Sequence, residues 1–181
     1  MIVGLTGKFA AGKGTVAEFL KERGFVYHSL SDVLRDELRA RGTPESRESL
    51  LALGNELRAA DGPAALAIRI QAKLRDGRRH IVDSIRTPAE VEVLRQLPGF
   101  FLLGVDADPQ VRFRRLRARA RVGDPETFEH FAALEARESA SSNPASQQLH
   151  ATWALADEIV DNGGTVETLH ASVEAVLARR A

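Results

Sequence analysis

Short apolar runs recur along the chain and alternate with longer segments in which apolar residues return at helical spacing. The runs cover residues 2–6, 25–28, 80–82, 100–105 and 158–160, and each has the length of a buried β-strand. Strands that are nearly continuous in hydrophobicity and separated by helices are typical of a parallel sheet covered on both faces. The pattern therefore predicts a three-layer α/β/α fold with a five-stranded parallel sheet.

Helix start and stop signals occupy the gaps between the first expected strands. A helical pattern over residues 14–23 ends at Gly24, a typical C-terminal stop. Ser31 is the expected N-cap of the next helix, which continues as far as Gly42. Helices thus follow strands in the order that the layered fold requires.

Two later segments are longer than a simple crossover between strands. Residues 43–78 carry two helical patterns broken at 61–63, Asp-Gly-Pro. Residues 119–156 are rich in charged and small polar residues, with breakers at 123–125 and 141–144. We expect a substrate-side helical insertion in the first segment and a short lid in the second.

Composition limits the classes of protein to which the chain can belong. Its 181 residues, 44% of them apolar, suit one globular domain over residues 1–181. The 25 basic and 25 acidic residues give no net charge, so neither a nucleic-acid nor a membrane partner is expected. The absence of cysteine excludes disulfides and thiolate zinc sites. The start of the chain does not resemble a signal peptide, and a cytoplasmic protein is therefore expected.

The strongest chemical signal is a segment rich in glycine and lysine directly after the first expected strand. It has the spacing Gly, four residues, Gly-Lys, and it opens the first expected helix. Glycines allow a tight turn in which successive N–H groups and the helix N-terminus face a phosphate. Lys13 is placed to reach the β- and γ-phosphates of a nucleotide, and the Thr15 hydroxyl to approach Mg²⁺. The predicted nucleotide-binding residues of this segment are Gly7, Lys8, Ala10, Ala11, Gly12, Lys13, Gly14 and Thr15.

The order Gly12-Lys13-Gly14-Thr15 resembles the phosphate loop of adenylate kinases and related nucleoside monophosphate kinases. This resemblance implies a P-loop NTPase fold, the cofactors ATP and Mg²⁺, and a small-molecule nucleotide as substrate. Two residues depart from the family pattern. Ala10 stands where adenylate kinases usually have glycine, and Lys8 adds a second positive charge to the loop.

Residues 29–35, Ser-Leu-Ser-Asp-Val-Leu-Arg, resemble the Ser-Thr-Gly-Asp-x-Leu-Arg segment of the same family. The resemblance places Ser31 at the acceptor site and implies that Arg35 grips the acceptor phosphate. The forked guanidinium of arginine suits such a contact. The alternative for Arg35 is a solvated position on the helix.

Residues 81–88 resemble the family segment Asp-Gly-Phe-Pro-Arg-Thr, shortened by one residue. The resemblance implies that Asp83 orients the water shell of Mg²⁺ and that Arg86 clamps the transferring or acceptor phosphate. A turn capped by the aspartate is the alternative. Adenylate kinases read AMP with a glutamine four residues after the clamp arginine, and this chain has Glu90 there. A carboxylate only accepts hydrogen bonds, so Glu90 is a candidate for reading the exocyclic amino group of cytosine or guanine.

A run of arginines follows the fourth expected strand and leads into the expected lid. Three of them are expected on a solvated helix face, namely Arg112, Arg114 and Arg117. Similarity to related kinases implies that Arg115 lies near adenine and that Arg119 or Arg121 closes on the phosphates. Arg137 is a further substrate-binding candidate in the lid.

Residues 157–164, Asp-Glu-Ile-Val-Asp-Asn-Gly-Gly, resemble the adenine-side ending of dephospho-CoA kinases, where the loop backbone, including Gly163, touches the base. The whole pattern is also similar to a largely archaeal group of P-loop kinase-like proteins. The isolated aromatic residues Tyr27 and Trp153 give no support to a stacking platform for single-stranded nucleic acid.

These features together favour transfer of the γ-phosphoryl group of ATP to a nucleoside monophosphate or a similar phosphorylated acceptor. Lys13, Asp83, Arg86, Arg119 and Arg121 are the predicted catalytic residues. Two alternatives remain open. One is a dephospho-CoA-kinase-like enzyme that phosphorylates a ribose hydroxyl, with Asp83 or Asp32 as general base. The other is a nucleotide-dependent switch or assembly ATPase without a small acceptor.

Overall fold

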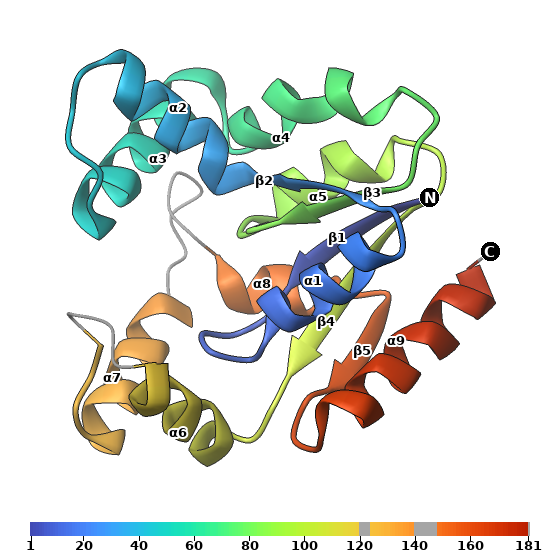
Figure 1. Cartoon of the computed structure of the whole chain (residues 1–181). Helices are drawn as coiled ribbons and strands as arrows, with labels where there is room; N and C mark the ends of the chain where they lie inside the picture. The colour runs from blue at the N-terminus through green and yellow to red at the C-terminus, as the bar shows by residue number, and fades with distance from the viewer. Residues whose placement is uncertain (120–123, 140–147, 181) are drawn as a thin grey trace.

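The sheet at the centre of the computed structural model consists of five parallel strands in the order β2-β3-β1-β4-β5 (Figure 1). The strands are β1 (Ile2–Thr6), β2 (Val26–Ser29), β3 (His80–Asp83), β4 (Phe100–Asp106) and β5 (Glu158–Asp161). The structure describes residues 1–119, 124–139 and 148–180, apart from the side chains of 47 and 137–139. All five expected strands are confirmed. Their carboxyl ends meet along one edge of the sheet, where ligands bind in open α/β folds.

Helices cover both faces of the sheet, which confirms the predicted three-layer fold. In the described ranges they are α1 (Lys13–Glu22), α2 (Leu30–Ala40), α3 (Arg47–Asp61), α4 (Ala65–Ile70), the 3₁₀ turn η1 (Gln71–Leu74), α5 (Pro88–Arg95), α6 (Pro109–Arg119), α7 (Phe128–Ser139), α8 (Leu149–Trp153) and α9 (Val166–Arg180). Buried side chains of α1 and α9 pack on one face, and those of α2 to α5 pack on the other. Both α6 and α7 lie beyond the carboxyl end of β4 (Figure 1). None of these helices combines the length and the apolar character needed to cross a membrane.

The N-terminus of α2 differs from the sequence expectation. Ser29, not Ser31, is the N-cap, because its backbone is extended at φ −123° and its hydroxyl accepts a hydrogen bond from Ser31 N at 3.2 Å. Since β2 continues to Ser29, the chain turns directly from strand into helix. Ser31 therefore lies in the first turn of α2, beside the carboxyl end of β2.

The expected break in the segment 43–78 is confirmed. Helix α3 ends at Asp61, Gly62 has a φ of 91°, and α4 begins at Ala65. Glycine adopts this backbone conformation at little steric cost. The expected lid segment contains α7 and α8, whereas Gly123 and the breaker at 141–144 lie outside the described residues.

A pair of histidines connects β2 to β3. His28 Nε2 lies 3.1 Å from His80 Nδ1, and His80 Nε2 lies 2.8 Å from Asp76 Oδ1. His80 is completely buried. Burial of His28, reinforced by the neighbouring His80 and Lys73, lowers the pKa of His28 below its ordinary value. The folded chain therefore favours a neutral imidazole at position 28.

We expect the folded state to lose stability as the pH falls below about 6.5. The unfolded chain protonates His28 at its ordinary pKa, whereas the folded chain does so only at lower pH, so acid favours unfolding between these two values. His28→Gln should reduce the difference between the Tm at about pH 7.5 and the Tm at about pH 5.5. Thermal unfolding monitored by circular dichroism gives both values. His130→Gln, at an exposed position on α7, is the control that should keep the wild-type difference. A His28→Gln variant with an unchanged difference would refute this assignment.

Candidate active site

The segment between β1 and α1 curls into a tight loop. Gly7, Ala10 and Gly12 have φ values of 151°, 59° and 100°. A Cβ on Gly7 would overlap the carbonyl oxygen of Val105, so glycine is required where the loop passes close to β4. Helix α1 begins directly after the loop, at Lys13. A loop of this kind at a helix N-terminus presents amide groups and partial positive charge to an anion.

Ala10 holds the backbone conformation expected of the glycine that it replaces. Its φ of 59° lies in the left-handed region, which costs a residue with a Cβ about 1–2 kcal/mol. The following residue, Ala11, is fully buried, and its N–H donates to Lys8 O at 3.2 Å. The curled geometry of the loop is therefore retained despite the departure from the family pattern.

Lys13 lies across the loop. Its Nζ donates to Gly7 O at 2.6 Å and to Lys8 O at 3.2 Å. Thr15 follows in the first turn of α1 and is half-buried. Both side chains therefore lie at the loop for which their spacing predicted phosphate binding.

Asn162, at the exit from β5, connects three parts of the site. Its Nδ2 donates to Ala11 O at 2.8 Å, and its backbone N donates to Asp106 O at 2.7 Å. Its Oδ1 accepts a long hydrogen bond from Arg115 Nη2 at 3.5 Å, while Arg115 Nη1 is buried without a hydrogen-bond partner among the described residues. A buried polar group without a partner costs about 1–3 kcal/mol, so a ligand at this position would stabilise the site. The adjoining Gly163 is exposed, and its N–H donates to Asp161 Oδ1 at 3.1 Å.

The sequence drew attention to the segment around Asn162 but not to this side chain. Its partners Ala11 and Arg115 lie 151 and 47 residues away along the chain. A Cβ on Gly12 would overlap Asn162 Nδ2, so the close approach of Asn162 requires glycine at position 12. No rule based on local spacing could have identified Asn162 as part of the site.

Asp83 ends β3, the strand beside β1. Its Oδ2 accepts from the Tyr27 hydroxyl at 3.1 Å, and its Oδ1 accepts from Ser84 N at 2.6 Å. Burial, reinforced by the Asp83 carboxylate, raises the pKa of Tyr27 to about 12. The Thr15 hydroxyl and the Asp83 carboxylate are oxygen donors of the kind that Mg²⁺ prefers. The chemistry of these two donors therefore fits the predicted metal.

Arg35 is engaged by two carboxylates on the exposed side of α2. Its Nε donates to Glu45 Oε1 at 2.9 Å, and its Nη1 donates to Asp32 Oδ1 at 2.7 Å. The hydrogen bond to Glu45 is the main cause of the raised pKa of Arg35. An acceptor phosphate would have to displace these carboxylates before Arg35 could grip it.

Glu90 has a structural role that contradicts its interpretation as a base-reading side chain. It is completely buried in the first turn of α5, where its Oε2 accepts from Arg86 N at 2.8 Å and from Thr87 N at 3.1 Å. Its Oε1 accepts from Arg58 Nη2 at 3.2 Å. Burial raises the pKa of Glu90 even though Arg58 opposes the shift. Both oxygens therefore serve the N-terminus of α5 and a buried ion pair, and neither is exposed to a base.

Arg112 also departs from its expected role on a solvated helix face. It is completely buried, its Nη2 donates to Glu135 Oε2 at 3.0 Å, and its Nη1 pairs with Glu135 Oε1. Its Nη1 also donates to Phe9 O at 3.3 Å. Arg112 thus joins α6, α7 and the phosphate loop. The solvated positions of Arg114 and Arg117 are confirmed.

The predicted lid arginines are only partly described. Arg119 makes a two-pronged ion pair with Asp124, with both N···O distances at 3.1 Å, and its guanidinium lies 4.6 Å from the centre of the Phe9 ring. Arg119 therefore reaches the phosphate loop from the end of α6. Arg121 lies outside the described residues, as does the side chain of Arg137 on α7.

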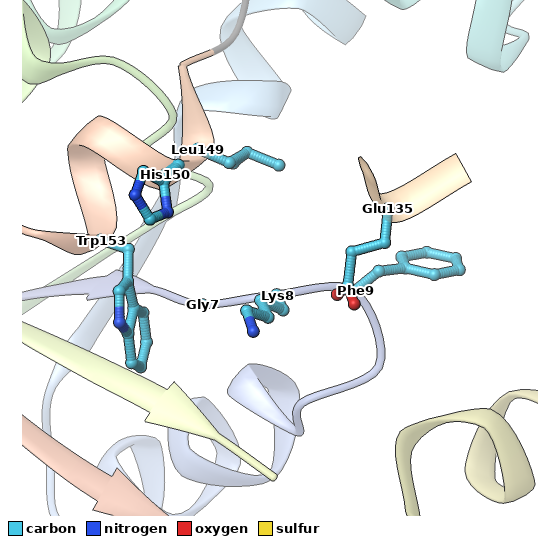
Figure 2. A pocket seen from close by; sticks show the side chains of 7 residues that line it. All are labelled: Gly7, Lys8, Phe9, Glu135, Leu149, His150 and Trp153. Carbon is cyan, nitrogen blue, oxygen red and sulfur yellow. The ribbon is translucent and has the colours of Figure 1, made fainter. Parts of the chain in front are cut away.

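A pocket opens beside the phosphate loop (Figure 2). Its lining residues are Gly7, Lys8, Phe9, Glu135, Leu149, His150 and Trp153. Figure 2 shows the α8 side chains on one side of Lys8, and Phe9 with Glu135 on the other. The pocket is thus walled by the loop, α7 and α8.

Helix α8 is held near the end of β3. Gln148 N, directly before α8, donates to Arg86 O at 2.9 Å. Arg86 itself is half-buried in the loop that connects β3 to α5. The pocket and the Asp83–Arg86 turn therefore lie at the same edge of the sheet.

Comparison with known proteins identifies relatives over nearly the whole chain. Residues 3–130 match a family model described as an AAA domain. The UPF0200 protein of Pyrococcus abyssi is 31% identical over 186 aligned positions, which cover 99% of this chain and 96% of the relative. The UPF0200 protein of Hyperthermus butylicus is 30% identical, with coverage of 99% and 94%.

Solved structures share the same fold. TT1252 from Thermus thermophilus has a TM-score of 0.63 at 22% identity, covering 99% of this chain and 97% of that chain. Shikimate kinase from Aquifex aeolicus has a TM-score of 0.58 at 12% identity, with the same coverage. A gluconokinase from Sinorhizobium meliloti has a TM-score of 0.56 at 14% identity, with coverage of 98% and 91%. The all-parallel sheet with its flanking helices is thus a P-loop kinase-like fold.

Proposed function

The chain belongs to the UPF0200 family and carries an AAA domain, and on this basis we propose that it is an ATP-dependent phosphotransferase. The acceptor in this proposal is a nucleoside monophosphate or a similar small phosphorylated molecule. The observation that carries the proposal is the curled loop at residues 7–12 with the Lys13 amine lying across it. That arrangement suits the β- and γ-phosphates of a nucleotide.

The side of the loop that faces β5 is the proposed position of the nucleoside of ATP. Arg115 Nη1, buried without a partner among the described residues, supports this placement, because a bound nucleotide could satisfy it. Thr15 and Asp83 would hold Mg²⁺, which supplies neutralising charge to the phosphates when it is bound with the nucleotide. Lys13 would exchange its carbonyl partners in the loop for phosphate oxygens.

The opposite side of the loop, toward Asp83 and Arg86, is the proposed acceptor side. An oxygen of the acceptor phosphate would attack the γ-phosphorus of ATP. The bond from that phosphorus to the bridging oxygen would break, and its electron pair would leave with ADP. Catalysis would rest on positioning and on charge stabilisation by Lys13 and Arg86, so no protein nucleophile is required.

Acceptor-stimulated ADP release tests this function. The purified chain is given ATP and Mg²⁺ with each ribo- and deoxyribonucleoside monophosphate in turn, and with dephospho-CoA. We expect a monophosphate to raise ADP release at least about tenfold, and Lys13→Ala to lose about 10²–10³-fold of that rate. ADP release that no acceptor stimulates would overturn the proposal and favour a nucleotide-dependent switch. Stimulation by dephospho-CoA alone would instead favour a kinase acting on a ribose hydroxyl.

A further inference from the structure

Lys8 is a cation at the phosphate loop that has no partner among the described residues. Within the described residues, no carboxylate lies within ion-pair distance of its amine, and no hydrogen bond engages it. Arg35, the predicted grip for the acceptor phosphate, is instead occupied by Asp32 and Glu45. The acid that lines the pocket, Glu135, has both oxygens engaged by Arg112. Among the described lining residues, the charge left available to a ligand is therefore the positive charge of Lys8.

Trp153 forms an aromatic wall of the same pocket. Its six-membered ring lies directly over Gly104 of β4, where a Cβ would stand 2.8 Å from Trp153 Cζ3 and 3.0 Å from Cη2. The absence of a side chain at Gly104 thus leaves room for the indole against the sheet. Among the residues that the structure describes, no acceptor lies within hydrogen-bond distance of the indole N–H. An aromatic surface whose indole N–H has no acceptor among the described residues is well suited to a planar polar ligand.

The position of α8 brings this wall to the acceptor side of the loop. The hydrogen bond from Gln148 N to Arg86 O fixes the start of α8 beside the Asp83–Arg86 turn. Trp153 packs on Gly104 of β4, which faces the same side of the sheet as Leu102 two residues earlier. Leu102 belongs to the core on the face covered by α2 to α5. That face is opposite to α1 and α9. A ligand on Trp153 would therefore reach the loop from the side opposite to Arg115 and Asn162.

From these contacts we propose that the pocket binds the acceptor as a nucleobase-bearing phosphomonoester, with the base on the Trp153 indole and the phosphate at Lys8. This proposal rests on the proposed phosphotransferase function, because it assigns the second substrate of that reaction. It moves base recognition from Glu90 on α5 to Trp153 and Leu149 on α8.

Trp153 is the only tryptophan of the chain, so its fluorescence reports on this pocket alone. The wild-type protein is first saturated with ADP and Mg²⁺ to fill the donor site. It is then titrated with AMP, CMP, GMP and UMP, and separately with ribose 5-phosphate, which has a phosphate but no base. A stacked base should quench the emission in a saturable way, whereas ribose 5-phosphate should leave it nearly unchanged.

Two variants separate the two contacts. Trp153→Leu should weaken nucleoside monophosphate binding by about tenfold, measured by calorimetry, and should leave the weaker ribose 5-phosphate binding unchanged. Lys8→Met should weaken both ligands by about tenfold, because it removes the cation that both phosphates contact. Equal losses of both ligands in Trp153→Leu would overturn the assignment of the base.

The outcomes also distinguish this proposal from the function on which it rests. An acceptor that stimulates ADP release but leaves Trp153 fluorescence unchanged would overturn the pocket assignment and keep the phosphotransferase. Saturable quenching by a monophosphate in a chain that no acceptor stimulates would keep the base-binding pocket and overturn the phosphotransferase. If dephospho-CoA, titrated in the same way, quenches the emission and no monophosphate does, the choice of a monophosphate acceptor would be overturned.

Discussion

Gly12→Ala is expected to lower ATP turnover by about 10²-fold while the chain stays folded. The new Cβ would overlap Asn162 Nδ2, and the φ of 100° at this position is unfavourable for any residue other than glycine. Asn162 would have to move, and its hydrogen bond to Ala11 O would be lost. A displacement of about 1 Å in a reacting site can cost about 10²-fold in rate. Initial rates of ADP release measure the turnover, and far-ultraviolet circular dichroism checks that the chain stays folded.

Gly14→Ala is the matched control for this prediction. It adds the same methyl group two residues further along, where, apart from the adjoining residues and the backbone of α1 itself, no atom of the described residues lies within 4 Å of the added Cβ and where φ is not positive. Alanine is also about 1 kcal/mol better than glycine inside a helix. Gly14→Ala should therefore lose less than about tenfold in turnover. Equal losses in the two variants would show that added bulk in the loop, and not the contact with Asn162, causes the effect.

Substitutions that break the buried Arg58–Glu90 pair should lower the free energy of unfolding more than substitutions in exposed ion pairs. Glu90 is completely buried and Arg58 is only 4% exposed, so either substitution leaves an uncompensated charge in the interior. Removing one partner of a buried ion pair lowers the free energy of unfolding by about 3–5 kcal/mol. In a chain of this size each kcal/mol lowers Tm by about 2–4 °C. We expect Arg58→Ala or Glu90→Ala to lower Tm by roughly 6–20 °C in thermal denaturation.

The exposed pair Arg39–Asp36 supplies the comparison. Its two side chains are 75% and 67% exposed, and exposed pairs contribute about 0–1 kcal/mol. Arg39→Ala should therefore change Tm by no more than about 4 °C. The prediction fails if Arg58→Ala and Arg39→Ala have the same Tm. The double variant Arg58→Leu/Glu90→Leu should recover part of the loss, because no charge is then left unpaired.

Much of the fold could be predicted because its signals are local. Each strand is a short apolar run, and each expected strand lies within one residue of the observed bounds. The main error in the first half of the chain concerned the N-cap of α2. Ser29 and Ser31 are equally good capping residues, and only the length of β2 decides between them.

The sequence by itself determined the phosphate loop, because its glycines, Lys13 and Thr15 lie within nine residues of one another and their spacing is recognisable without the rest of the chain. Only the tertiary structure decided which charged side chains remain available. Arg112 pairs with Glu135 across 23 residues, and Glu90 pairs with Arg58 across 32. Burial and pairing of these groups depend on packing between helices that no local pattern encodes. The same packing brings Trp153 beside Lys8, which no carboxylate of the described ranges engages, and this is why the candidate acceptor pocket could be recognised only in the folded chain.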